Sequence, residues 1–302
     1  MSVSVVITTK NESSSIGALI HSLGAQTLLP KEVIIVDAYS DDDTVEKIKK
    51  NQKKIPFPLK LIQKKGNRSV GRNAGVVAAK HDWIAITDAG CVPNQRWLEH
   101  LVKNQKKSKK NIVSGKQEVA ATNSLERAIS TYIIPKNQKN HQPMTRNVLL
   151  HRHVWERVGG FDESLSLNED YPFFLKALEY FPYSFASDAV VNWKPRSSYL
   201  DFFWQIHNYA RGDAGAGIIR PKVWLLILRF ALFCLLTLLF LATESVFLGS
   251  IVVLLCILYA VWSVAKHISR FPRGWYYFPV LQIVTDGAVL LGTAKGAIDR
   301  KN

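Results

Sequence analysis

The chain has 302 residues, of which 47% are hydrophobic, and its 39 lysines and arginines against 24 acidic residues give a formal net charge of +15. This length suits two ordinary domains or one large domain followed by a membrane region, and three cysteines exclude a disulfide-stabilised scaffold. The basic surplus suits an anionic membrane surface better than nucleic acid, because the lysine clusters lack interleaved exposed aromatic residues.

The first half of the chain is predicted to alternate strands with helices. Short apolar runs typical of buried strands occupy residues 3–9, 32–37, 59–63, 83–88 and 112–118, and helix-length stretches lie between them at residues 13–26, 43–53, 69–80 and 94–107. This alternation indicates an α/β fold with a mostly parallel sheet covered by helices on both faces. Ligands of such sheets bind at the carboxyl ends of the strands, so the polar segments that follow the strands form the candidate site.

Residues 120–198 are less regular. They hold a predicted helix at 123–134, a basic loop at 135–146, a Gly159-Gly160 turn, a helix that begins at Glu169-Asp170 and a short strand at 190–193. The stretch 199–211 spaces its apolar residues at i, i+1, i+4 and i+7, which predicts an amphipathic helix. Such a helix would lie on a membrane surface, although packing beneath the preceding domain gives the same pattern.

The C-terminal third is predicted to be a membrane region. Residues 223–265 are almost continuously apolar, which is enough for two crossings of about 20 residues each, at about 223–243 and 245–265. A buried soluble helix pair is the alternative, but a chain of this size seldom buries two such helices on every face. A third apolar segment, 276–294, contains Pro279, Gln282 and Asp286, which favours an interfacial or re-entrant helix over a third crossing.

The orientation follows from the charges that flank these spans. Arg220 and Lys222 precede the first span, and Lys266, Arg270 and Arg273 follow the second. By the positive-inside rule, the N-terminal domain is cytosolic and the tip of the hairpin faces away from the cytosol. No signal-peptide pattern precedes the first strand. We therefore expect a multi-pass protein of the cell membrane with a domain at 1–198, an interfacial segment at 199–222 and a membrane region at 223–302.

Five short segments occur in an order typical of one enzyme family. They are residues 5–12 (VVITTKNE), 36–44 (VDAYSDDDT), 71–75 (GRNAG), 87–90 (TDAG) and 159–163 (GGFDE), the last followed by 168–170 (NED). Together they resemble the family 2 glycosyltransferases, and the resemblance covers nearly the whole chain. It implies a GT-A fold, which is a Rossmann-like, mostly parallel sheet that binds a nucleotide-sugar, followed here by C-terminal transmembrane helices.

The resemblance also implies which residues hold the donor. Carboxylates on loops can hydrogen-bond a base and a ribose, and Asp37 resembles the contact to the base edge in the family. A basic side chain near helix N-terminal amides can approach phosphates, which favours Arg72. Taken alone, Glu12 and Asp37 would be explained as a helix N-terminal acid and a turn residue. The expected donor-binding set is Thr9, Asn11, Glu12, Asp37, Arg72, Asn73, Asp88 and Ala89.

Asp88 falls where the family carries its DxD signature, which implies a divalent metal. Mg²⁺ or Mn²⁺ suits such oxygen ligands and stabilises the leaving nucleoside diphosphate. Here Gly90 replaces the second aspartate. Water, the phosphates and another side chain would then complete the metal shell, or cationic residues would take over part of its task. Cys91, next to it, is expected to be a small buried residue in a loop.

By resemblance, Asp170 is the general base of an inverting transfer, and Glu169 positions or contacts the acceptor. Acids at a helix start are otherwise commonly caps. Arg146, Asn147, Gln205 and Arg211 are expected to contact the acceptor or a phosphate. Gln205 and Arg211 fall where processive relatives carry Gln-x-x-Arg-Trp, but the spacing differs and no tryptophan follows. An arginine that snorkels to the interface would explain Arg211 equally well.

The function predicted from the sequence is the inverting transfer of a single sugar from a UDP- or GDP-sugar to a lipid or lipid-linked acceptor at an anionic membrane surface. Two alternatives remain open. A processive polysaccharide synthase would need a translocation channel, for which two or three spans are few. A membrane scaffold that binds a nucleotide-sugar without turnover is compatible with Gly90. We expect no nucleic-acid partner.

Overall fold

The computed structural model describes residues 1–300, and the last two residues of the expected membrane region lie outside that range. The chain divides into two compact units. The first unit comprises residues 1–120 and 135–194, and the second comprises residues 121–134 and those from 195 onward. The predicted N-terminal domain, 1–198, therefore differs from the first unit, because residues 121–134 leave it and join the C-terminal helices.

The first unit is built on one mixed sheet of eight strands in the order β3-β2-β1-β4-β7-β6-β8-β5. The strands are β1 (Val3–Thr9), β2 (Glu32–Asp37), β3 (Leu59–Gln63), β4 (Trp83–Thr87), β5 (Cys91–Pro93), β6 (Ile112–Val119), β7 (Asn147–His151) and β8 (Tyr183–Trp193). The first four strands pair in parallel, as does β6 with β8. β7 runs antiparallel to both neighbours, and β5 runs antiparallel to β8.

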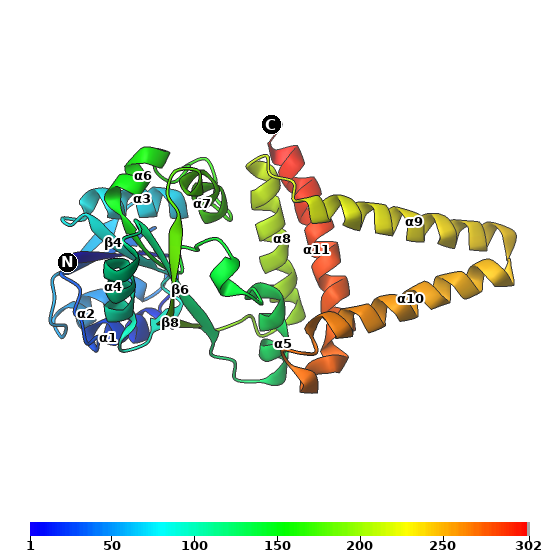
Figure 1. The fold of residues 1–302 in the computed structure, drawn as a ribbon, viewed down its shortest axis with the longest axis horizontal. Coiled ribbons are helices and arrows are strands. Elements are labelled where there is room, and N and C mark those ends of the chain that lie inside the picture. The colour runs from blue at the N-terminus through cyan, green and yellow to red at the C-terminus, as the bar shows by residue number, and fades with distance from the viewer. Residues whose placement is uncertain (301–302) are drawn as a thin grey trace. The chain divides into compact units, whose positions relative to one another are not determined.

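Helices cover both faces of this sheet (Figure 1). They are α1 (Ile16–Gly24), α2 (Thr44–Gln52), α3 (Arg68–Ala78), α4 (Trp97–Ser108), α6 (Arg152–Val158) and α7 (Asp170–Leu178), with a short 3₁₀ turn, η1 (Gln138–Asn140). Side chains alternate across a strand, so Val5 and Ile7 pack with α1, α2 and α4, whereas Val6 packs with α3, α6 and α7. Both faces are apolar, which explains the continuous apolar runs of the sequence.

The predicted parallel strands are present, and the second half of the unit adds the antiparallel strand β7 between β4 and β6. Two details differ from the sequence prediction. The final strand spans Tyr183–Trp193 instead of 190–193, and its first part mixes polar and apolar residues that gave no clear strand signal. Cys91 lies in the short strand β5 rather than in a loop, and it is buried as expected.

The second unit is helical. It contains α5 (Ser124–Ile133), α8 (Tyr199–Gly215), α9 (Pro221–Thr243), α10 (Val246–His267), the 3₁₀ turn η2 (Pro272–Tyr277) and α11 (Phe278–Asp299). Phe202 and Ile206 of α8 are buried in one cluster with Ile129 of α5 and Leu281 of α11. The apolar face of α8, expected at the membrane surface, is therefore covered by helices of its own unit.

Two glycines bring α8 and α11 into close contact. A Cβ atom at Gly292 would lie 2.3 Å from the carbonyl oxygen of His207, and one at Gly296 would lie 2.3 Å from that of Arg211. Any side chain at these positions would therefore push the two helices apart.

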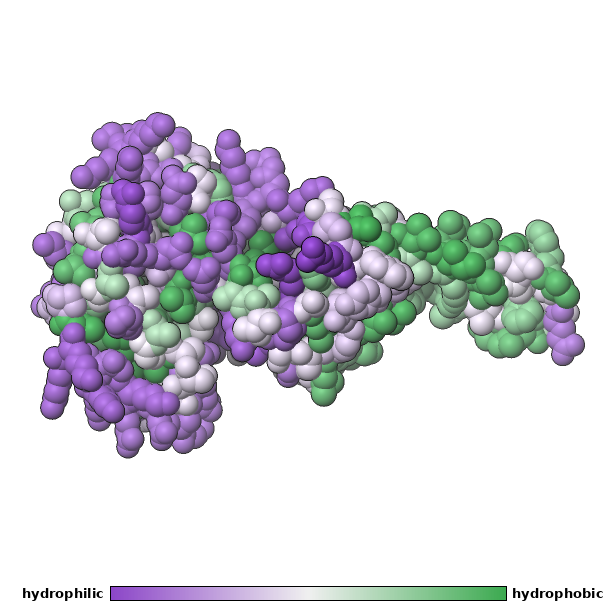
Figure 2. Space-filling view, turned by 90° about the horizontal axis from the view of Figure 1, so that it is seen from below, coloured by the Kyte–Doolittle hydropathy of each residue, from purple (hydrophilic) through white to green (hydrophobic). Residues whose placement is uncertain are grey.

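Three helical segments are long and apolar enough to cross a membrane. Pro221–Thr243 and Val246–His267 have mean hydropathies of 2.7 and 2.4 and are only 6% buried within the protein. Their side chains form a continuous hydrophobic surface (Figure 2). The third segment, Pro272–Asp299, has a mean hydropathy of 1.3 and is 33% buried. It contains the predicted 276–294 segment and packs partly against α8, which fits its weaker apolar character.

Candidate active site

The site forms where parallel strands of the first unit end. Thr9 and Asp37 are register partners at the ends of β1 and β2, and Asp88 follows the last residue of β4. The carboxyl ends of neighbouring parallel strands share one edge of the sheet, so the sheet itself brings these side chains together.

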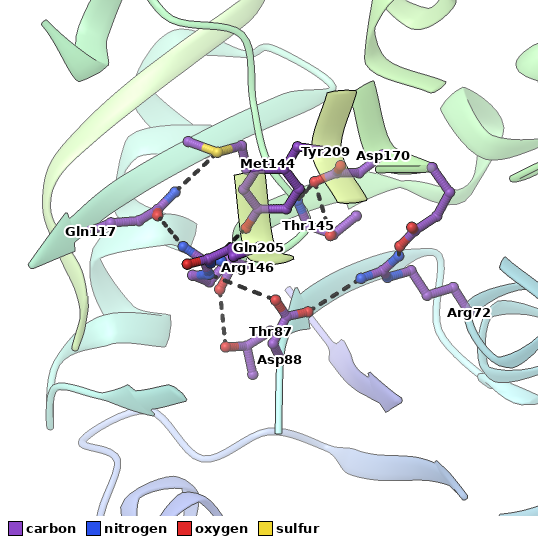
Figure 3. A network of polar contacts seen from close by, with 11 residues as sticks. Arg72, Thr87, Asp88, Gln117, Met144, Thr145, Arg146, Asp170, Gln205 and Tyr209 are labelled. Atoms are coloured by element: carbon purple, nitrogen blue, oxygen red, sulfur yellow. Dashed lines mark hydrogen bonds and ion pairs between the residues drawn. The ribbon is translucent and has the colours of Figure 1, made fainter. Parts of the chain in front are cut away.

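A buried arginine connects the candidate residues. The Arg72 side chain rises from α3, is almost inaccessible to solvent, and donates to Asp88 Oδ1 at 3.2 Å and to Glu169 Oε1. Burial alone would lower the pKa of Arg72, but the charges of Glu169, Asp88 and Asp170 raise it. Arg72 therefore stays charged and links the end of β4 to the start of α7 (Figure 3).

A second arginine lies on the other side of Asp88. Arg146 Nε is 3.7 Å from Asp88 Oδ2, and its Nη1 donates to Gln117 Oε1 at 3.1 Å. Its guanidinium stacks 4.5 Å from the ring centre of Trp193, and its carbonyl accepts from Thr87 Oγ1 at 3.0 Å. Arg146 is thus fixed by three strands, and the Asp88 carboxylate lies between two guanidinium groups (Figure 3).

The pKa values of Asp88 and Asp170 are shifted in opposite directions. Burial works against ionisation of Asp88, but Arg72, Arg146 and Arg68 together hold its pKa below the usual value. For Asp170, burial and the nearby Glu169 charge outweigh Arg72, so the pKa is raised. One carboxyl is kept ionised while the other is disposed to take up a proton, which is a pattern typical of acid–base sites.

Asp170 is the first residue of α7, and Glu169 is its N-cap. The carboxylate of Asp170 accepts from the backbone N–H and the Oγ1 of Thr145, at 3.3 and 3.2 Å. The Glu169 side chain caps no helix N–H, and its Oε1 receives the Arg72 bond instead. Helix capping therefore does not explain Glu169, which holds Arg72 in place.

The loops after β1 and β2 are tied to each other. Asn11 has a left-handed backbone conformation with φ of 55°, its N–H donates to Ser40, and its Oδ1 accepts from the N–H of Asp41. Asp37 is fully buried and accepts from the N–H and Oγ of Ser40 at 3.0 and 2.5 Å. These bonds make the pair of loops a preformed wall of the site.

Several buried polar atoms of the predicted residues have no hydrogen-bond partner within residues 1–300. They are Thr9 Oγ1, Arg72 Nε and Glu169 Oε2. Buried polar groups nearly always find a partner, so such atoms are expected where water or a ligand supplies it.

The surroundings of Gly90 bear on the metal. A Cβ atom at Gly90 would meet only the carboxylate oxygens of Glu12, at 3.8 and 3.9 Å, and the Asp88 side chain is 36% exposed. Residues 1–300 contain no group of three or more histidine, cysteine or acidic side chains that could hold a metal. Mg²⁺ is commonly bound by one or two carboxylates together with substrate phosphates and water. A metal here would be held by Asp88, with Glu12 near the position of the replaced aspartate and the donor phosphates completing the shell.

Two of the predicted contact residues have structural tasks. Asn73 donates to the Phe161 carbonyl and to Glu163, and its Oδ1 accepts from Trp155 and from the Phe161 N–H. It therefore holds the Gly159–Phe161 turn rather than an open position for a donor.

Asn147 is 1% exposed, and both of its side-chain N–H groups bond the carbonyls of Lys116 and Ala189. Its Oδ1 accepts from Trp97 of α4, so the polar atoms of the Asn147 side chain are all bonded within the fold instead of contacting an acceptor. The Ala89 side chain is also buried, in the apolar core.

Gln205 and Arg211 lie on α8, in the second unit. Arg211 Nε pairs with Asp299 at 2.6 Å, and Gln205 donates to Tyr209 at 3.0 Å. The site geometry described here is that of the first unit, so the acceptor or phosphate role of these two residues stays a prediction.

Three further site residues are absent from the sequence prediction. Gln117 and Trp193 hold Arg146, and Thr145 bonds Asp170. They come from β6, β8 and the loop before β7, and only the pairing of these strands brings them to the site. The Thr145-Arg146 pair, placed directly before a strand, was the available signal.

Comparisons with known proteins identify the family of this chain. The model of the family described as "Glycosyl transferase family 2" matches residues 4–165. The protein YwdF of Bacillus subtilis, described as an uncharacterized glycosyltransferase, is 24% identical over 72% of this chain and 80% of its own length.

Two solved structures share the fold. Mannosyltransferase PcManGT from Pyrobaculum calidifontis, in complex with GDP-Man and Mn²⁺, has a TM-score of 0.66 and 17% identity over 95% of this chain and 86% of its own. Staphylococcus aureus TarS 1–349, in complex with UDP-GlcNAc, has a TM-score of 0.56 and 20% identity over 70% of this chain and 66% of its own.

Proposed function

This chain belongs to glycosyl transferase family 2 and is a glycosyltransferase with a GT-A fold, and we propose that it transfers a single sugar, with inversion, from a UDP- or GDP-sugar to a lipid or lipid-linked acceptor. The observation that carries this proposal is the buried Arg72 side chain, which bonds Asp88 and Glu169 next to Asp170, where the pKa of Asp170 is raised and that of Asp88 is lowered. Both lie within one network held by Arg72.

In this mechanism Asp170 is the general base. The acceptor oxygen forms its bond to the anomeric carbon while the bond from that carbon to the diphosphate breaks on the opposite face. The hydroxyl proton passes to the Asp170 carboxylate, whose pKa is raised by burial and by Glu169. A carboxylate with a raised pKa is a stronger base than an ordinary aspartate and holds the proton that it receives more effectively.

The leaving group is a nucleoside diphosphate, on which negative charge develops. Arg72 and Arg146 supply two fixed positive charges next to Asp88, and preorganised charges of this kind stabilise a transition state without reorganisation. A bound Mg²⁺ or Mn²⁺, held by Asp88 and Glu12, would neutralise part of the same charge. The Mn²⁺ in the PcManGT complex supports a metal.

The donor wall is proposed to consist of Thr9, Asn11, Glu12 and Asp37. The unpartnered Thr9 oxygen and the preformed loop pair at Asn11 and Asp37 support this role. The structural neighbours carry UDP-GlcNAc in one case and GDP-Man in the other, so both bases are retained in the proposal.

The membrane helices favour an acceptor that is itself in the membrane. We propose that α9 and α10 form a hairpin whose flanking cations stay on the cytosolic side, together with the first unit. An enzyme held at the headgroup level meets a lipid acceptor more often than a freely diffusing enzyme does.

A donor screen tests the proposal. The full chain, purified in detergent, is titrated with UDP and GDP by calorimetry, with Mn²⁺ and with EDTA, and the products formed on membrane lipids are weighed by mass spectrometry. Addition of one sugar supports the proposal, whereas a ladder of masses would establish a processive synthase. Nucleotide binding without turnover on any donor would establish a scaffold.

A further inference from the structure

Three polar side chains, each on a different apolar helix of the second unit, meet at one position along these helices. Arg229 of α9 forms an ion pair with Asp286 of α11, and Tyr259 of α10 donates to the same carboxylate at 2.7 Å. Each of the three lies about two turns, or about 12 Å, from the end of its helix. Ionisable groups at such depth are costly in a bilayer and mark functional sites.

The hydrogen bonds of this cluster saturate its one carboxylate. The second oxygen of Asp286 accepts from Gln282 at 2.8 Å, and Gln282 in turn accepts from Lys266 at 3.2 Å. Lys266 Nζ also lies 5.0 Å from the ring centre of Trp262. Two positive charges, those of Arg229 and Lys266, therefore lie near a single negative charge, and the group keeps a surplus of positive charge.

A cavity of about 600 Å³ opens beside this cluster, between α9 and α10. Arg229, Tyr259 and Trp262 line one end of the cavity. The guanidinium of Arg229 lies 5.0 Å from the ring centre of Tyr259. Further along the helices its walls are apolar, and they include Phe233 and Leu255. The cavity thus has a cationic end at Arg229, about two turns from the helix end, and an apolar end toward the middle of the spans.

We propose that this cavity binds one anionic phospholipid. The phosphate lies at Arg229 and Lys266, and one acyl chain fills the apolar part. The positive surplus selects the charge of the headgroup. Arg229 Nε, which is buried and has no hydrogen-bond partner within residues 1–300, is available to a phosphate oxygen.

The site is formed within the second unit alone and does not depend on the proposed transfer reaction. It is tested on the full chain in detergent, mixed with equal amounts of phosphatidylglycerol and phosphatidylcholine that carry the same acyl chains. Native mass spectrometry then measures which lipid the protein retains. We expect one phosphatidylglycerol per chain, and equal retention of the two lipids would overturn the proposal.

Matched variants locate the site. Cys256→Phe fills the cavity and is expected to abolish the selective retention, whereas Cys234→Phe, on α9 outside the lining, is expected to retain it. Lys266→Gln is expected to weaken the preference about fivefold, equivalent to about 1 kcal/mol for one basic residue. Arg273→Gln removes an exposed cation outside the lining and should behave as the wild type. The same loss in both phenylalanine variants would refute the assigned position.

Discussion

Replacing Asp170 with asparagine is expected to reduce catalysis and to raise stability. Asparagine keeps the shape of the side chain and an oxygen that accepts the two Thr145 bonds, at 3.3 and 3.2 Å, but it cannot take the acceptor proton. Loss of a general base lowers kcat by about 10²- to 10⁴-fold, equivalent to about 3–5 kcal/mol of transition-state stabilisation.

The gain in stability follows from the raised pKa of Asp170. Burial and the Glu169 charge raise it above the ordinary value of 3.8, so the ionised carboxylate destabilises the folded protein at neutral pH. Stability rises as pH falls through the raised pKa, because the folded state then binds a proton that the unfolded state does not. Each unit of the shift is about 1.4 kcal/mol, and asparagine removes this penalty at neutral pH.

The assay combines initial transfer rates at saturating donor with thermal unfolding of the same samples. Asp170→Asn should unfold about 2–4 °C higher for each kcal/mol gained, and the acid limb of the wild-type kcat/KM profile should report the raised pKa. Asp162→Asn, an exposed aspartate in the preceding turn, is the control and should change neither quantity appreciably. A variant that keeps more than a tenth of the activity, or that loses stability together with activity, would refute the reasoning.

Four further substitutions test other residues of the candidate site. Arg72→Met leaves buried Glu169 unpaired and should lower the free energy of unfolding by about 3–5 kcal/mol in denaturant titrations. Arg146→Met removes the partner of a partly exposed carboxylate and should lower it by about 1 kcal/mol. Equal losses in the two variants would contradict the burial argument. Gly90→Asp adds a carboxylate where only Glu12 oxygens lie nearby, so the variant should fold. It should need several-fold less Mn²⁺ for half-maximal activity. An unchanged Mn²⁺ requirement would refute the proposed position of the metal. Asn73→Ala should lower stability by about 2–3 kcal/mol with no change in donor KM, and a raised KM at unchanged stability would instead restore its role in donor binding.

The first half of the fold could be predicted closely from the sequence. β1, β2 and β3 begin and end at the predicted residues. β1 and β2 are short apolar runs buried on both faces, and the edge strand β3 alternates apolar with polar residues. The second half could not be predicted as well. Strand β8 alternates exposure irregularly along its length, and the antiparallel position of β7 depends on partners distant in the chain.

Some residues of the candidate site could likewise be predicted from the sequence, and others could not. Asp88, Arg72 and Asp170 were predicted from ordered motifs, and the structure brings them into one network. Asn73 and Asn147 lie next to these motifs but serve the fold. An amide side chain gives the same signal in a sequence whether its partners belong to a ligand or to a nearby turn, and only the hydrogen-bond geometry separates the two cases.

Residues 121–134 belong to the second unit, and this restricts where the chain can be truncated. Within α5, Thr131 bonds His267 at 3.0 Å, Tyr132 donates to the Phe278 carbonyl, and Ile129 is fully buried. A fragment that ends near residue 198 would keep this helix but lose every one of these partners. Such a fragment would carry a bare apolar surface and self-associate, so a soluble catalytic fragment requires α5 to be redesigned or removed together with the membrane helices.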